Sequence, residues 1–265
     1  MIDPGKSGRD SGSDSAGERE RGVAALAEEV IRRLASSRPS EADERRKQRL
    51  LDIFCEMLTT GDGDRAAQFV SQLRAGGVGY DALHLDWIAP AVRQLGKGWT
   101  DDTLSFAAVS LASSRLHLIL RSLGREQSRP QEPRPTPSAE GIRLLIAIPD
   151  GESHTLGIEI FANLVRHHGW DAELSLAETA QALVARLEAR ACDVVVLVRY
   201  DSAADMDLRA LIARLREDLP TRTRIALAAG SPPGPCEAAV AAADAHLPDF
   251  ETAIDRLARL FSRRS

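Results

Sequence analysis

From residue 142 to the C-terminus, short apolar runs alternate with segments of helical periodicity, and this alternation constrains the fold more than any other feature. Runs such as Val194 to Val198 are apolar without interruption, as in a strand that is buried on both faces. Strands that alternate with helices form a parallel sheet with helices on its faces. The expected strands are about 143–148, 172–176, 193–198 and 223–228, with a short edge strand near 245–248; the expected helices are about 157–168, 179–190, 204–218 and 249–263. We therefore expect a flavodoxin-like domain with five parallel strands over residues 142–265.

The N-terminal half lacks this alternation. Residues 1–40 are polar and are expected to form a disordered tail with one short amphipathic helix. Residues 41–124 carry four segments of helical periodicity with short connections, which predicts a four-helix bundle. We expect its third helix to kink before Pro90 and its fourth to turn Phe106 inward. Residues 125–141 are rich in proline and polar residues and are expected to be a linker. The predicted fold class is thus α plus α/β.

Composition and charge exclude several classes of function. The formal net charge of −5 and the lack of a helix-turn-helix pattern argue against an autonomous DNA-binding protein. No apolar run approaches the roughly 20 residues that span a bilayer, and the first residues lack an apolar signal core, so we expect a cytoplasmic protein. The three cysteines lack metal-ligand spacing. We find no nucleophile–base pair, phosphate loop or metal cluster, and we do not expect an enzyme.

The loop after the first expected strand of the alternating half holds the candidate ligand residues. It reads Pro-Asp-Gly-Glu-Ser-His-Thr-Leu-Gly over residues 149–157. Loops at the carboxyl ends of parallel strands are where open α/β sheets bind ligands. His154 offers an imidazole, Glu152 a carboxylate that can hold the second ring nitrogen, and Gly157 leaves room for a large flat ligand. The alternative is that His154 is a surface histidine at the start of the following helix.

Glu-x-His-x-x-Gly in this position resembles the Asp-x-His-x-x-Gly motif of cobalamin-binding domains, with glutamate in place of aspartate. The resemblance implies that His154 is the lower axial ligand of cobalt and that Glu152 is its hydrogen-bond partner. It implies that Val198 stands where the family commonly has a serine or threonine. It also implies that Gly230 and Ser231 border the nucleotide tail of the cofactor.

The helical half resembles the bundle that precedes such domains in cobalamin photoreceptors. Leu-Gly-Lys-Gly-Trp at residues 95–99, followed by an acidic turn, matches their pattern, in which the tryptophan covers the upper face of the corrin. The alternative for Trp99 is an anchor of the bundle core. The Glu-His pair of the CarH/LitR light sensors is absent, because residues 106–110 read Phe-Ala-Ala-Val-Ser. This difference favours hydroxo- or aquocobalamin over adenosylcobalamin. His84 and His117 are candidates for an upper axial ligand.

Taken together, these features most resemble the AerR/PpaA regulators, over about residues 22–262. The resemblance implies a light- or redox-responsive transcriptional antirepressor of photosynthesis genes. Such a protein would act through a repressor of the CrtJ/PpsR type and would contact DNA only indirectly or weakly, with no membrane contact. Two alternatives stay open. AppA-type sensor domains hold heme, which would make His154 an iron ligand. Corrinoid proteins of methyltransferase systems share the same two-domain plan.

Overall fold

The computed structural model describes residues 41–60, 63–127, 142–149, 155–199, 205–220, 222–229 and 237–262. Contacts divide the chain into two compact units. The first unit runs to Leu83 and includes Arg93–Arg115, and the second comprises His84–Val92 and Leu116–Ser265. Helix α6 (Phe106–Gln127) therefore belongs to both units. No helix within these described ranges is long and apolar enough to cross a membrane.

The first unit is helical, as predicted. Helices α2 (Glu41–Thr59) and α3 (Gly63–Ala75) pack through the rings of Phe54 and Phe69, which stack with their centroids 5.1 Å apart. Arg115 of α6 donates hydrogen bonds to the carbonyl oxygens of Met57 and Leu58 at 3.0 and 2.8 Å. These two carbonyls lie in the last turn of α2 and have no intrahelical partner, so the guanidinium caps that helix.

The expected kink before Pro90 takes the form of a π-helical segment. The helical stretch begins as α4 (Tyr80–Ala82), widens into η1 (Leu83–Ile88) and continues as α5 (Ala89–Thr100). Proline has no backbone N–H and its ring crowds the preceding turn, so an ordinary α-helical turn cannot run through this position without strain. The wider π turns end two residues before Pro90 and accommodate it.

The turn between α5 and α6 corrects one prediction. Asp102 adopts a left-handed conformation with φ of 55°, and the Ser105 hydroxyl accepts a hydrogen bond from the Ala108 N–H at 3.2 Å, which caps α6. Phe106 was expected to face inward, and that prediction is wrong, since the side chain is 72% exposed. As the first residue of α6, it has no preceding helical turn to cover it. The helix runs to Gln127, three residues into the predicted linker. The remaining linker residues and the predicted tail lie outside the described part of the chain.

The second unit contains a five-stranded, fully parallel sheet of order β2-β1-β3-β4-β5, which confirms the predicted flavodoxin-like fold class. The strands are β1 (Arg143–Pro149), β2 (Asp171–Glu178), β3 (Val194–Arg199), β4 (Arg224–Ala229) and β5 (Ala245–Leu247). Strand β1 has β2 on one side and β3 on the other, so the chain changes direction across the sheet at β1. Ligands of such sheets bind at this switch point, beyond the carboxyl ends of the strands.

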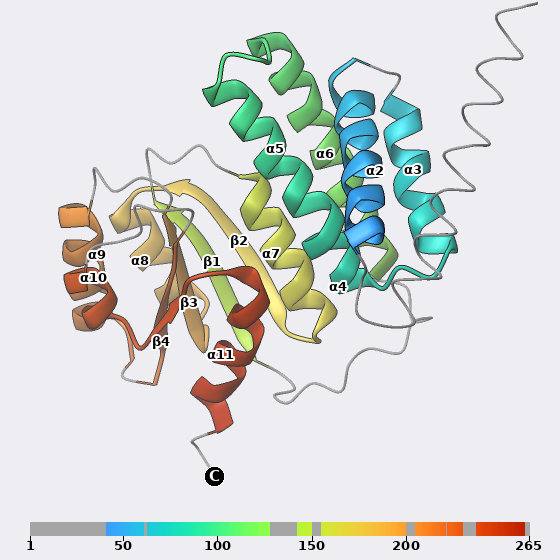
Figure 1. The fold of residues 1–265 in the computed structure, drawn as a ribbon. Helices are drawn as coiled ribbons and strands as arrows, with labels where there is room; N and C mark the ends of the chain where they lie inside the picture. Colours follow the sequence, from blue (N-terminus) through green and yellow to red (C-terminus); the bar gives the residue numbers. More distant parts are fainter. Residues whose placement is uncertain are drawn as a thin grey trace, which may run out of the picture. The chain divides into compact units, whose positions relative to one another are not determined.

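Helices cover both faces of the sheet (Figure 1). Helices α7 (Leu156–His167) and α11 (Phe250–Ser262) pack on the face to which Val196 contributes. Helices α8 (Ala180–Ala189), α9 (Asp205–Asp218) and α10 (Glu237–Ala242) pack on the face to which Val195 contributes. Neighbouring residues of a strand point to opposite faces, which explains why β3 is apolar at every central position. Helix α10 was not expected, because its six residues directly follow a stretch rich in proline and glycine.

A charged cluster anchors the start of β5. The Asp244 carboxylate accepts hydrogen bonds from Arg216 of α9 at 2.6 Å, from Arg224 of β4 at 3.3 Å and from the Ile225 N–H at 2.8 Å. Burial by itself would raise the pKa of Asp244, but the N–H donor and the two guanidinium groups outweigh it and hold that pKa below its usual value of 3.8. The carboxylate therefore links three elements of the sheet edge.

Candidate functional site

The candidate site lies at the carboxyl edge of the sheet, where β1 ends at Pro149 and α7 begins at Leu156. Of the predicted cofactor residues, Glu152, His154, Gly230 and Ser231 lie outside the described residues. The structure describes the elements that flank these segments along the chain, namely β1 and α7 for the first pair and β4 and α10 for the second. Gly157, Val198 and Trp99 complete the predicted set, and all three are described.

Gly157 is the second residue of α7 and is half-buried. The N–H groups of the first helical turn have no partner within the helix, and a residue without a side chain leaves them open to an approaching ligand. Ile158, the next residue, is fully buried and fixes this end of α7 against the sheet. Gly157 therefore adds no side chain at the start of α7, directly after the loop that carries His154.

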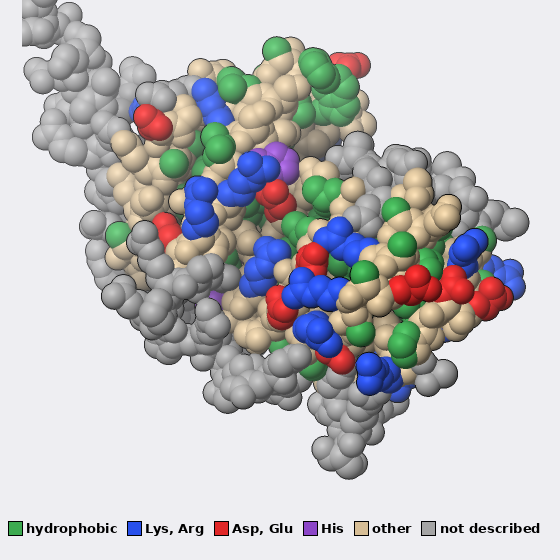
Figure 2. Space-filling view, turned by 180° about the vertical axis from the view of Figure 1, so that it is seen from behind, with side chains coloured by type: hydrophobic (Ala, Val, Ile, Leu, Met, Phe, Trp, Pro, Cys, Tyr) green, Lys and Arg blue, Asp and Glu red, His purple; other side chains and the backbone are tan. Residues whose placement is uncertain are grey.

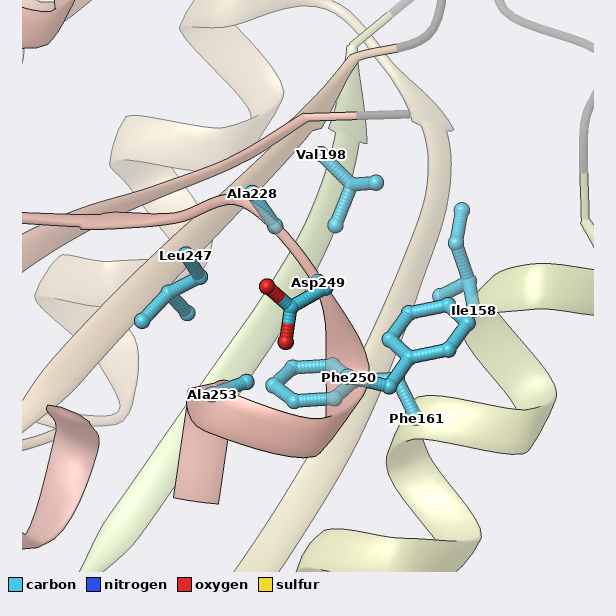
Figure 3. A pocket seen from close by; sticks show the side chains of 8 residues that line it. All are labelled: Ile158, Phe161, Val198, Ala228, Leu247, Asp249, Phe250 and Ala253. Carbon is cyan, nitrogen blue, oxygen red and sulfur yellow. The ribbon is translucent and has the colours of Figure 1, made fainter. Parts of the chain in front are cut away.

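A small hollow opens between α7, α11 and the ends of three strands (Figure 3). Its lining residues are Ile158, Phe161, Val198, Ala228, Leu247, Asp249, Phe250 and Ala253. The volume is about 10 Å³, which is room for roughly one water molecule. The rings of Phe161 and Phe250 stack with centroids 5.9 Å apart and an interplanar angle of 16°, and they narrow the space between the two helices. Val198, only 3% exposed, presents an apolar wall where the resembling family has a hydroxyl.

Among the described residues that line this hollow, Asp249 supplies the one carboxylate. One carboxylate oxygen, Oδ1, accepts hydrogen bonds from the Thr252 N–H at 2.7 Å and the Thr252 hydroxyl at 2.9 Å, so Asp249 caps α11. In Figure 3 the carboxylate lies among the apolar side chains of the hollow. Sequence reasoning did not single out Asp249. Its position immediately after Pro248 and before an amphipathic segment is a helix-start pattern that could have identified it.

A second polar cluster lies at the first turn of α7. His117, in the half of α6 that belongs to the second unit, places Nδ1 2.8 Å from Glu159 Oε2 and Nε2 3.3 Å from the Thr155 hydroxyl. Sequence reasoning found no such hydroxyl–imidazole–carboxylate group, because its members come from separate helices. Both ring nitrogens are engaged within the protein. The other histidine considered as an upper ligand, His84, is fully buried.

In the first unit, Trp99 is not a core anchor. Its side chain is 48% exposed and meets the exposed ring of Phe106 edge-on, with centroids 6.1 Å apart. Figure 2 shows hydrophobic side chains gathered at the end where α5 and α6 meet. Gly98 lets the Leu104 side chain pack closely against this turn, since a Cβ there would lie 2.7 Å from it. The result is an exposed aromatic surface on the first unit.

The described residues hold no group of three or more histidine, cysteine, aspartate or glutamate side chains that could bind a metal ion. Burial raises the pKa of Cys55 to about 12, with a further contribution from Asp52. Burial, followed by Asp193, raises the pKa of Cys192 to about 11. Both thiols therefore stay protonated at neutral pH, and neither offers a thiolate to a metal.

Comparison with known proteins gives one relative in sequence and several in structure. No family model matches the chain. A Rhodobacter capsulatus protein described as an uncharacterized 20.5 kDa protein in the bchF-crtJ intergenic region is 30% identical over 157 residues, which are 58% of this chain and 76% of that protein. The Methanosarcina barkeri monomethylamine corrinoid protein superposes with a TM-score of 0.64 at 12% identity, over 81% of this chain and all of that one. A cobalamin-binding protein from Desulfitobacterium hafniense DCB-2 aligns with a TM-score of 0.41 at 13% identity, over 79% of this chain and 97% of that one. The chain thus shares its fold with a corrinoid protein.

Proposed function

Because the chain belongs to the family of the Rhodobacter capsulatus 20.5 kDa protein of the bchF-crtJ intergenic region, we propose that it is a cobalamin-binding transcriptional regulator. In this proposal it is a light- or redox-responsive antirepressor that acts on a repressor of the CrtJ/PpsR type. The relative's description places it beside crtJ, the gene name of that type of repressor, which supports the regulatory part. The fold shared with a corrinoid protein supports the cofactor part.

The observation that carries the cofactor part is the position of the loop with Glu152 and His154. This loop follows β1, the strand at which the sheet order reverses, and precedes α7. In a cofactor bound at this edge, His154 would be the protein ligand of the metal. Only the neutral imidazole has a lone pair for cobalt, so acid should weaken binding. Glu152 would hold the second ring nitrogen and keep the ring oriented.

The described residues fit one part of a corrinoid better than another. Gly157 adds no side chain at the start of α7 that would obstruct a flat ring. In the first unit, Trp99 and Phe106 expose an aromatic surface of the kind that packs on such rings. The hollow beside Val198 has no room for a nucleotide base unless Phe250 turns away. When bound, a corrinoid would supply cobalt, which can exchange a bound ligand in response to light or to oxidants. We expect contacts to the ring to dominate the affinity.

In this proposal the chain is not an enzyme, works in the cytoplasm and reaches promoters only through its partner protein. A methyl-carrying corrinoid protein is the second candidate, because the superposition spans the whole of the monomethylamine corrinoid protein. Heme is the alternative ligand. The narrow hollow favours it, since heme lacks a nucleotide tail.

The first test is a visible absorbance spectrum of the purified full chain offered aquocobalamin, adenosylcobalamin and hemin separately. His154→Ala should lose or alter the bound spectrum, and Glu152→Gln should weaken binding roughly 10- to 100-fold, as for other partners of metal-ligating histidines. His168→Ala, at the opposite end of α7, is the matched control and should bind as the unaltered chain does. A Soret band that depends on His154 would replace cobalamin by heme. Retention of neither pigment would refute ligand binding at this loop.

The regulatory part needs a separate test. The cobalamin-loaded chain should bind a repressor of the proposed type in a pull-down, with a difference between dark and illuminated samples. Methyl transfer from bound methylcobalamin to a thiol acceptor, with turnover, would contradict the regulator and establish the carrier.

A further inference from the structure

Helix α6 is shared between the two units, and its second half is held to α7 by polar contacts at successive turns. Glu159 lies between His117, at 2.8 Å, and Arg121, at 4.0 Å, which are one helical turn apart on α6. One turn further along α7, the Asn163 amide donates to the Leu120 carbonyl at 3.0 Å. The two helices approach so closely at Gly124 that a Cβ there would lie 3.0 Å from Asn163 Oδ1.

His117 differs from the other contacts because it also reaches the residue that follows His154. The Nδ1 atom faces the Glu159 carboxylate, an acceptor, so Nδ1 carries a proton. In the neutral ring, Nε2 then accepts a hydrogen bond from the Thr155 hydroxyl. The side chains of His117 and Glu159 are only 26% and 19% exposed, so water screens this pair less than an ion pair on the open surface.

We propose that His117 is a positioning residue that transmits the state of the ligand loop to α6. The inference rests on the proposed function, since it takes His154 as the ligand. Thr155 is the next residue in the chain, so binding at His154 constrains the backbone that carries the Thr155 hydroxyl. Nε2 of His117 accepts a hydrogen bond from that hydroxyl, and Nδ1 of the same ring holds α6 to Glu159. The first half of α6 belongs to the other unit, so a change at His117 is passed along one continuous helix.

The contacts of Arg121 and Asn163 cannot play this part. Among the described residues they join α6 to α7 without reaching Thr155, so they are not placed to respond to its hydroxyl. Leu118, next to His117 on the same helix, is 64% exposed and provides a matched control position.

The test is amide hydrogen exchange of the full chain, without ligand and with aquocobalamin, for the unaltered protein, His117→Leu, His117→Gln and Leu118→Ala. A hydrogen bond to a charged group is lost in His117→Leu, so without ligand we expect exchange in residues 116–127 and in the first turn of α7 to rise together by about tenfold. Aquocobalamin should change exchange across α6 in the unaltered chain and in Leu118→Ala. In His117→Leu the corrin spectrum should still show binding, while the response of α6 is lost. His117→Gln, which keeps a donor and an acceptor, should restore part of the response.

Each outcome bears on the inference separately from the proposed function. An α6 response that persists in His117→Leu, or that is absent in the unaltered chain with cobalamin bound, would overturn it. Failure of the unaltered chain to bind aquocobalamin would refute the cobalamin proposal. The ligand-free comparison then decides the inference, because faster exchange in only one of the two helices would show that His117 does not join them.

Discussion

Replacing Phe250 by alanine tests whether the hollow between α7 and α11 limits the ligands that the chain accepts. The Phe250 ring stacks on Phe161 and narrows a space of about 10 Å³. A fully buried phenylalanine replaced by alanine costs about 3–5 kcal/mol, and Phe250 is half-buried, so we expect a loss of about 2 kcal/mol in the free energy of unfolding. For a chain of this size that loss lowers the melting temperature by about 4–8 °C.

The packing contacts of Phe250 also determine how its replacement should change the affinity for corrinoids. A nucleotide base can enter the hollow of the unaltered chain only if Phe250 gives up contacts worth about 2 kcal/mol, which is roughly a 30-fold penalty in affinity. Phe250→Ala removes that penalty for cobalamin and leaves cobinamide, a corrin without the nucleotide, unaffected. The ratio of the two dissociation constants should therefore shift by about 10- to 30-fold in favour of cobalamin.

Absorbance titrations of both corrinoids, with a thermal melt of each variant, measure these effects. Ile254→Ala is the control: Ile254 lies on the same helix and packs against the same core without lining the hollow. It should lower the melting temperature and leave the affinity ratio unchanged. If Phe250→Ala binds cobalamin with an unchanged ratio, the nucleotide does not enter this hollow and the reasoning is refuted.

The remaining predictions concern stability. Gly96→Ala on α5 meets open space and should stabilise the chain by about 0.5–1 kcal/mol through helix propensity, whereas Gly124→Ala must displace Asn163 and should not raise the melting temperature. Equal melting temperatures for the two variants would contradict the close approach of α6 and α7. Asp244→Asn should destabilise the chain by about 1 kcal/mol at neutral pH, because it removes charge-assisted hydrogen bonds. Below about pH 4, the variant should lose less stability with falling pH than the unaltered chain does. Folding lowers the pKa of Asp244, so this carboxylate stabilises the folded chain fully above pH 3.8. That stabilisation is lost as the pH falls through the pKa that Asp244 has in the folded chain. Burial, with the charge of Arg256, lowers the pKa of His246 below 6.5. The folded chain should therefore lose stability as the pH falls below 6.5, because the unfolded chain binds this proton more readily. In thermal melts over a series of pH values, His246→Gln should lack this loss of stability.

Much of the fold follows from local pattern. The uninterrupted apolar run at Val194–Val198 identifies a strand buried on both faces, and the alternation around it specifies a parallel sheet and its place in the chain. The loop with Glu152 and His154 could be identified because such loops sit at strand ends, whatever the rest of the chain does. Pro90 marked a distortion, because a missing N–H acts locally.

Tertiary structure decided what depends on segments far apart in the chain. The order of the strands places the loop after β1 at the switch point, and only the packing of α6 on α7 brings His117 to Glu159, 42 residues away. Phe161 and Phe250 likewise meet across the hollow, although α7 and α11 are separated in the sequence by most of the sheet. Periodicity placed Phe106 inward, yet its exposure depends on what lies beyond the end of its helix. Periodicity and motifs record which residues each element buries, whereas the contacts between elements arise only when their surfaces meet.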